Sequence, residues 1–259
     1  MELFTLKLIT RSWWRNKIFF FISLLSLSIG LACTNLLLTF FIYEYNIESN
    51  LPDKEQIVCL QQDAPMQEGA KVSYAVGTIP ALLKDKFAEI EEYVRINTMS
   101  AQYCKYNTEV FHDVTFICAD ASLLCFFDYQ TRTGNLKEVL IHPDQVAVSE
   151  EFAQKMFGDT DPIDKHIDVS MSDNGNKTYV VKALIKARPQ SLLRFDLITG
   201  TESTFWGGFT LLKLTEGSSP QSLADKINNE SIPTLLPGEG RYYLKPFSEI
   251  YFSTSGKTS

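Results

Sequence analysis

The feature that most constrains this chain is an apolar segment near its start. Residues 18–43 are 26 consecutive positions without a charged side chain. A helix of that length, at about 1.5 Å per residue, spans roughly 39 Å, which exceeds the ~30 Å hydrocarbon core of a bilayer. No other window of the chain is comparably apolar. We therefore predict one transmembrane helix over residues 18–43, crossing with some tilt.

Charge sets the expected orientation of this helix. Four basic residues and one acidic residue precede it: Lys7, Arg11, Arg15, Lys17 and Glu2. The chain totals are 24 basic and 31 acidic residues, so 20 and 30 follow the segment, a net charge of −10. The positive-inside rule then places residues 1–17 in the cytosol and residues 44–259 outside the membrane. An acidic outer part argues against nucleic acid as a partner.

Two other interpretations of the segment compete with a retained helix. The apolar region of a secretory signal is about 7 to 15 residues long, so this one is too long, and no small-residue cleavage site follows it. "GLAC" loosely resembles a lipoprotein signal ending at Cys33, but Gly30 stands where Leu is usual and the apolar sequence continues. We favour retention in the membrane, with lipidation of Cys33 as the alternative.

The segment and its flank contain residues suited to a membrane helix that packs against another. Ser26, Gly30 and Thr34 are spaced four apart, so they share one face and would allow close approach of a second helix. Small residues are also common in membrane spans that have no such role. Residues 1–17 resemble a short amphipathic helix on the cytosolic face. Its expected membrane-junction residues are Trp13, Trp14, Arg15 and Lys17.

Residues 44–259 have the pattern of one continuous α+β domain, with room for two lobes. Alternating segments such as "QIVCLQQD", "TEVFHDVTFICAD" and "GGFTLLKL" predict strands, and "KHIDVSMSDNGNKTYVVKALI" predicts a hairpin turning at Asp173-Asn174-Gly175. Strands mix with scattered helices in place of strict βαβ repetition. Two short helices are expected after Ser149 and Ser219, and Gly158 should end the first.

A third helix is expected after Gly77. Thr78 can cap it, and Pro80 lies in the first turn, where proline is tolerated. Four apolar residues are expected to form its buried stripe: Leu82, Leu83, Phe87 and Ile90.

The sequence offers no catalytic, cofactor or metal site. The terminal "SGKTS" resembles the end of a phosphate loop, but the required earlier glycine is Tyr251. His112, His142 and His166 have no partner at metal-ligand spacing. Acidic turns such as "GDTDPIDK" lack the ligand set of a calcium loop, and turns favour Asp in any case. We predict a protein that is not an enzyme, with no cofactor.

The outer domain contains four cysteines, whose state the sequence leaves open. Cys59, Cys104, Cys118 and Cys125 would face an oxidising compartment, where disulfides form. All four lie in apolar segments, where cysteine commonly acts as a small buried hydrophobic residue. Free buried thiols are the favoured interpretation and one disulfide is the alternative.

The order of these features resembles permease subunits of the MacB/FtsX type in ABC transporters. "SWWRNKIFFFISLLSLSIGLAC" resembles the start of their first membrane helix, with its W-R-N-K junction and "IGLA". "PALLKDKFAEIEEYVRI" and "FFDYQTRTGNLKEVLIHPDQVAVSEEFAQKMFGDTDPIDKHI" resemble their periplasmic core domain. "SLLRFDLITG" and "YYLKPFSEIYFST" are similar to later landmarks. The resemblance runs along nearly the whole chain.

The resemblance implies a two-lobed α+β periplasmic domain that follows the first helix of an inner-membrane permease. It also implies a cytosolic ATPase partner, a homo- or heterodimer of permeases, and ATP-driven helix motion that moves the outer domain during efflux or contact with envelope proteins. In this family the permease chain transmits motion and does not catalyse a reaction. The alternative from another class is a single-span anchored interaction or sensor module that does not itself transport.

Two departures from the family pattern shape our expectations. The family has three or more further membrane helices after this domain, and residues up to Ser259 do not include them. A truncated product, a fragment and a stand-alone single-span relative are the alternatives. Asp164 stands where the family's "DPIGK" has glycine, and Asp tolerates a left-handed turn, so we expect the fold to be kept.

Overall fold

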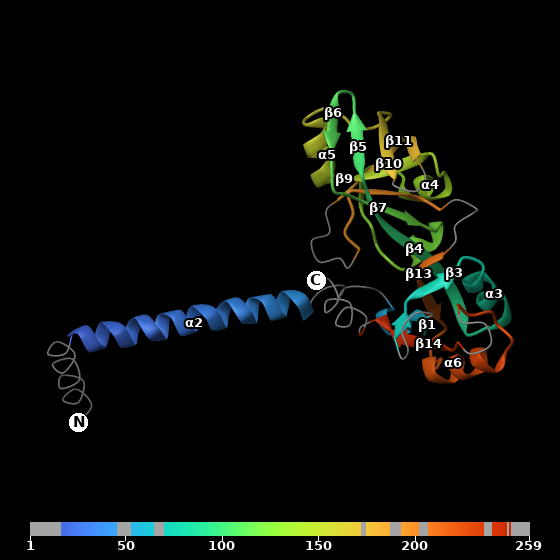
Figure 1. The fold of residues 1–259 in the computed structure, drawn as a ribbon, viewed down its shortest axis with the longest axis horizontal. Helices are drawn as coiled ribbons and strands as arrows, with labels where there is room; N and C mark the ends of the chain where they lie inside the picture. Colours follow the sequence, from blue (N-terminus) through green and yellow to red (C-terminus); the bar gives the residue numbers. More distant parts are fainter. Residues whose placement is uncertain are drawn as a thin grey trace. The chain divides into compact units, whose positions relative to one another are not determined.

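The computed structural model divides the chain into two units, residues 1–49 and residues 50–259 (Figure 1). The residues that the structure describes are 17–45, 53–64, 70–171, 175–186, 193–201, 207–235, 240–247 and 249.

In the first unit, α2 (Lys17–Tyr45) is a helix of 29 residues. Its part from Phe21 to Ile42 has a mean hydropathy of 2.0, and no other described helix is long and apolar enough to cross a membrane. Ser28 and Thr34 each donate a 2.8 Å hydrogen bond to the backbone carbonyl four residues earlier. Their hydroxyl groups are therefore satisfied within the helix, as a bilayer interior requires.

In the second unit the described strands form one mixed sheet (Figure 1). The strands are β1 (Ile57–Asp63), β2 (Lys71–Val72), β3 (Tyr74–Val76), β4 (Ile90–Ala101), β5 (Tyr103–Tyr106), β6 (Glu109–Phe111), β7 (Val114–Ala119), β8 (Thr131–Gly134), β9 (Gln145–Ser149), β10 (His166–Met171), β11 (Gly175–Ile185), β12 (Leu197–Gly200), β13 (Gly207–Leu214) and β14 (Tyr242–Pro246). Their main order is β14-β1-β13-β4-β7-β12-β9-β11-β10-β5-β6, while β2, β3 and β8 pair with β1, β13 and β11. Only β7–β12 and β9–β11 are parallel among these described pairs. The predicted α+β class is confirmed.

Short helices cover this sheet. They are η1 (Lys54–Gln56), α3 (Ile79–Lys86), η2 (Ala121–Cys125), α4 (Leu136–Ile141), α5 (Glu150–Phe157) and α6 (Pro220–Asn229). The Ser149 hydroxyl accepts a 3.3 Å hydrogen bond from the backbone N–H of Phe152, and Gly158 with φ +58° follows the last residue of α5. Ser219 caps α6 in the same way, with a 3.4 Å bond from Ser222. The predicted starts of both helices are confirmed.

The third predicted helix is shorter than its sequence pattern indicated. α3 ends at Lys86, and Ile90 opens β4, so this residue is buried from a strand. Leu82 is 37% exposed and is not part of a buried stripe, whereas Leu83 is fully buried. Thr78 makes no side-chain cap; its backbone carbonyl accepts the first turn's bond from Leu82. The apolar spacing continued past the helix because the next strand buries its own first residue in the same core.

Two predicted turns involve residues with a left-handed backbone. β10 and β11 form the predicted antiparallel hairpin, in which Met171 is opposite Gly175; Asp173 and Asn174 lie outside the described residues. Asp164 has φ +63°, and its carboxylate lies 2.6 Å from the ammonium group of Lys182. The structure thus bears out that Asp adopts the left-handed conformation at this position.

Three apolar cores hold the second unit together. The shared core lies on one face of the sheet and includes Cys59, Val94, Ile96, Ile117, Leu140 and Leu211. The α5 core includes Ala101, Phe116, Val148, Phe152, Met156 and Leu197. The α6 core includes Val58, Leu83, Ile90, Leu212, Leu223 and Ile227. Because side chains alternate along a strand, neighbouring residues of β1 and β13 serve the shared core and the α6 core in turn.

Candidate functional site

The predicted helix-packing residues share a face of α2. Ser26, Gly30 and Thr34 are exposed, and a Cβ atom added at Gly30 would meet nothing within 4 Å. Of the predicted membrane-junction residues, Trp13, Trp14 and Arg15 lie outside the described residues, and Lys17 is the first residue of α2. Both roles remain predictions. Residues 21–42 of the helix are all exposed, so exposure alone does not single out these three residues.

The side-chain types that bind metals do not gather at one place among the described residues. Among the described residues, no group of three or more His, Cys, Asp or Glu side chains is placed to hold a metal ion. Nδ1 of His112 lies 3.1 Å from the carbonyl oxygen of Gln102, and His142 and His166 follow α4 and begin β10. The three histidines therefore belong to separate elements.

None of the five cysteines, all of which lie in the described part of the chain, forms a disulfide. Cys59 and Cys104 are buried, and desolvation raises the pKa of each thiol to about 12. Cys118 is half-buried, while Cys125 and the helix residue Cys33 are exposed. A thiol with such a raised pKa is scarcely ionised at neutral pH, so the two buried groups are chemically inert there.

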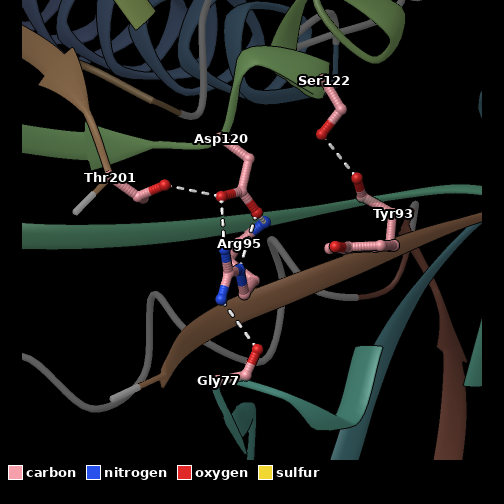
Figure 2. Close-up of polar contacts among 6 residues, drawn as sticks. All are labelled: Gly77, Tyr93, Arg95, Asp120, Ser122 and Thr201. Atoms are coloured by element: carbon pink, nitrogen blue, oxygen red, sulfur yellow. Dashed lines mark hydrogen bonds and ion pairs between the residues drawn. The ribbon is translucent and has the colours of Figure 1, made fainter. Parts of the chain in front are cut away.

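The most elaborate polar site is a cluster in the middle of the sheet (Figure 2). Nε of Arg95 donates to Oδ2 of Asp120 at 2.8 Å, and Nη2 donates to Oδ1 at 2.7 Å, which is a bidentate ion pair. Nη1 donates to the carbonyl oxygen of Gly77 at 2.7 Å. The hydroxyl of Thr201 donates to Oδ1 of Asp120 at 2.7 Å. The carboxylate thus receives bonds from three directions.

Local strand geometry explains why these residues meet. β4 and β7 are antiparallel, and the pairing of Ile96 with Ala119 brings Arg95 beside Asp120, directly after the end of β7. The Arg95 backbone N–H donates to Oδ2 of Asp120 at 3.0 Å, and Asp120 N–H donates to the Arg95 carbonyl at 3.2 Å. The loop before α3 supplies Gly77, and the end of β12 supplies Thr201.

The surroundings of Arg95 favour its charged form. Only 18% of the Arg95 side chain and 12% of the Asp120 side chain are exposed. The hydrogen bond to Asp120 raises the pKa of the Arg95 guanidinium against the opposing effect of burial. A half-buried, charge-assisted bidentate pair exceeds a solvated surface pair in strength, and removal of one partner leaves an unpaired charge. The Asp120 carboxylate and the Thr201 hydroxyl are both engaged in hydrogen bonds within this cluster.

Sequence reasoning did not identify this cluster. One signal was present: Arg95 is the basic residue within the otherwise apolar and neutral stretch "YVRINT", and Asp120 ends the buried strand "FICAD". Charges inside strand patterns invite a search for partners, but their pairing depends on strand register, which local sequence does not specify.

The fold and these features define a class of protein: a sheet-rich α+β domain that follows one apolar N-terminal helix in the chain. The sequence model for the MacB-like periplasmic core domain matches residues 20–230. This match covers most of the chain and includes the greater part of α2. The chain belongs to the family of proteins with a MacB-like periplasmic core domain.

Solved structures support the same assignment of fold. A domain from a protein named as a permease of Porphyromonas gingivalis is 18% identical, with a TM-score of 0.62 over 76% of this chain and 93% of that one. The periplasmic region of MacB from Actinobacillus actinomycetemcomitans is 10% identical, with a TM-score of 0.54 and coverage of 79% and 94%. The extracellular domain of YknZ, a noncanonic ABC-type transporter from Gram-positive bacteria, is 14% identical, with a TM-score of 0.53 and coverage of 73% and 98%. No significant match was found among curated proteins.

The resemblance stated from sequence is therefore confirmed. The family match and the three similar structures support a transporter-associated, membrane-anchored protein with an extracytoplasmic domain.

Proposed function

We propose that this chain is a permease-type subunit of an ABC transport complex of the cytoplasmic membrane. α2 crosses the bilayer with its N-terminus in the cytosol, and residues 50–259 form the periplasmic domain. A separate cytosolic ATPase hydrolyses ATP and drives the helix motion, which the domain passes on during efflux or to an envelope protein. The observation that carries this proposal is the continuous family match, which begins within α2 and extends through α6.

The arrangement of the chain suits transmission of motion. α2 ends at Tyr45, and the first described residue of the domain is Asp53. Eight residue steps reach at most about 28 Å when fully extended, so this tether limits how far the helix can move without pulling on the domain. A sheet whose strands share three cores then carries the displacement as a body, because packed interiors have low compressibility.

Packing of α2 against another permease helix is the second part of the proposal. Lipid chains are as apolar as leucine, so helices associate in a bilayer through close van der Waals contact. The exposed strip of Ser26, Gly30 and Thr34 is the part of α2 that permits the closest backbone approach. We infer that this strip faces the partner permease in a homo- or heterodimer.

The test is recovery of the ATPase. The full chain, tagged at its C-terminus, is expressed in its own host, extracted in mild detergent and purified, and its partners are identified by mass spectrometry. An ABC ATPase recovered at near-stoichiometric amounts is the expected result. Extracts that yield the intact chain with no ATPase would contradict the proposal and favour a single-span interaction or sensor module.

Orientation is tested separately with a membrane-impermeant thiol reagent. Cys125 is exposed on the domain, so it should react in spheroplasts, in which the outer face of the cytoplasmic membrane is accessible. A Cys125→Ser chain is the control. Labelling of Cys125 only after the membrane is broken would show the opposite orientation. Mass spectrometry of the same samples detects lipidation of Cys33 directly.

A further inference from the structure

One face of the sheet holds two apolar cores with a polar band between them. On β4, Tyr93 packs against the α6 core, while Met99 and Ala101 belong to the α5 core. These residues alternate with Val94 and Ile96 of the shared core, so they lie on the opposite face. The two positions between them on that face are Arg95 and Asn97.

The neighbouring strands continue this polar band. Thr210 of β13 is opposite Arg95 and is fully buried. Asp120 lies two residues after Cys118, which packs against the α5 core. Thr201 comes directly after β12 and lies four residues after Leu197 of the same core. An even spacing along an extended chain keeps side chains on one face. We define the polar band by the five residues Arg95, Asn97, Asp120, Thr201 and Thr210.

We call the part of the domain around the α5 core the α5 end and the part around the α6 core the α6 end. Apolar packing therefore joins these two ends on one face of the sheet only. On one face the shared core runs through β1, β13, β4, β7 and β12 without interruption. On the other face the contact is made by directional polar bonds centred on the Arg95–Asp120 pair (Figure 2). Arg95 also bonds the Gly77 carbonyl in front of α3, which packs in the α6 core.

Directional bonds and apolar packing respond differently to an applied displacement. Packing resists displacement through many weak contacts, whereas a bidentate ion pair is either made or broken. A sheet that is packed on one face and bonded on the other can flex about its packed face once the bonds open. Loss of one partner also exposes the polar band to water, which solvates the opened state.

We propose that the Arg95–Asp120 pair is a conformational latch that holds the α5 end and the α6 end of the domain in one arrangement. With the latch closed the domain moves as one body; with the latch open the two ends move relative to each other about the shared core. The use of this latch in transport rests on the function proposed above, but the latch itself is a property of this chain alone.

The test measures the distance between the two ends by pulsed electron paramagnetic resonance. Nitroxides are attached on the helices α5 and α6 (Figure 1), at Lys155→Cys and Asp225→Cys. The parent side chains are exposed. The reactive background is removed by Cys33→Ser, Cys118→Ala and Cys125→Ser. Cys59 and Cys104 are retained because both are buried. The full chain is measured in nanodiscs.

The expected result is a single narrow distance population in the parent and a second population in Arg95→Met. A minor state of a few per cent or less is typical of a closed equilibrium, and we expect the second population to exceed about one tenth in the variant. The matched control is Lys84→Met, which breaks the 2.7 Å pair between Lys84 and Glu92 within the α6 end. This control should retain the parent distribution.

Two results overturn the latch: an Arg95→Met distribution identical to the parent, or an equal change in Lys84→Met. Where Arg95→Met does not fold, Arg95→Lys decides the question, because lysine keeps the charge but cannot bond both Asp120 and the Gly77 carbonyl in the same geometry. A second population in Arg95→Lys supports the latch and its absence refutes it. No ATPase is present in this experiment, so its outcome is independent of the co-purification test.

Discussion

Substitution of Gly134 by alanine should destabilise the domain much more than the same change at Gly217. Both glycines have φ +81°, so alanine suffers the same left-handed backbone strain, about 1 kcal/mol, at either position. They differ in what a new Cβ atom would meet. At Gly134 it would lie 2.0 Å from the carbonyl oxygen of Lys182 and 2.8 Å from the Cα atom of Ala183, whereas at Gly217 it would meet nothing within 4 Å.

The magnitude follows from the pairing of β8 with β11. Gly134 is opposite Ala183. To lengthen the 2.0 Å contact to an ordinary separation of about 3.2 Å, the backbone of β8 must retreat by more than 1 Å. Such overpacking costs about 1–3 kcal/mol, and loss of one or two ladder hydrogen bonds adds about 1 kcal/mol each. Together with the backbone strain, Gly134→Ala should therefore lower the free energy of unfolding by about 3–6 kcal/mol, against about 1 kcal/mol for Gly217→Ala.

The difference in the free energy of unfolding is measured by urea unfolding of the full chain in detergent. Susceptibility to a protease reports the unfolded fraction at each urea concentration. With a denaturant slope of about 3 kcal/mol per M for a domain of this size, the midpoint should fall by about 1–2 M for Gly134→Ala and about 0.3 M for Gly217→Ala. Equal midpoints for the two variants would refute the argument, because the two glycines share a φ of +81° and differ in the space around them.

Three further predictions concern other parts of the chain. Ser149→Ala should cost about 1 kcal/mol of stability, seen as a urea midpoint lowered by about 0.3 M, because the N-cap of α5 is lost. At pH 8 a maleimide should label Cys125 readily and Cys59 and Cys104 roughly a thousandfold more slowly, with their rates rising tenfold per pH unit toward their pKa of about 12. Gly30→Leu should weaken association of α2 about tenfold in nanodiscs, measured by energy transfer between labelled chains.

Each of these has its own control. Ser149→Asp keeps a cap acceptor and should restore the midpoint; if alanine and aspartate behave alike, capping is not the cause. Fast labelling of Cys59 at pH 8 in the folded chain would contradict its burial. For the helix, Ala32→Leu adds a leucine on the opposite face, and an equal loss of association in both variants would remove the small-residue strip as the contact.

Local signals predicted the secondary structure where one residue determined the conformation. Ser149 and Ser219 were assigned as caps because a hydroxyl just before an apolar helical pattern has few other uses, and both caps are present. Asp164 was assigned a left-handed backbone from the glycine expected there, and its φ is +63°. The helix α3 was less well predicted, because Ile90 fits the spacing of the helix although it belongs to the following strand.

The polar band escaped prediction for a different physical reason. Arg95, Asp120 and Thr201 lie on three strands, and only the register of β4 with β7 and of β7 with β12 brings them together. A shift of one residue in either pairing would turn these side chains to the other face, into the shared core. Register depends on the packing of all three cores at once, so a single sequence contains the charges without stating their partners.

The position of the Arg95–Asp120 pair limits the free energy that its desolvation costs. A charged pair inside a continuous apolar core is costly, because desolvation of both ions offsets their attraction. Arg95 and Asp120 instead lie where the α5 core and the α6 core end, partly exposed, with Gly77 and Thr201 providing the remaining bonds. The pair therefore retains part of its solvation while it is closed. In the latch proposed above, this partial solvation lowers the cost of opening relative to an ion pair inside a fully apolar core.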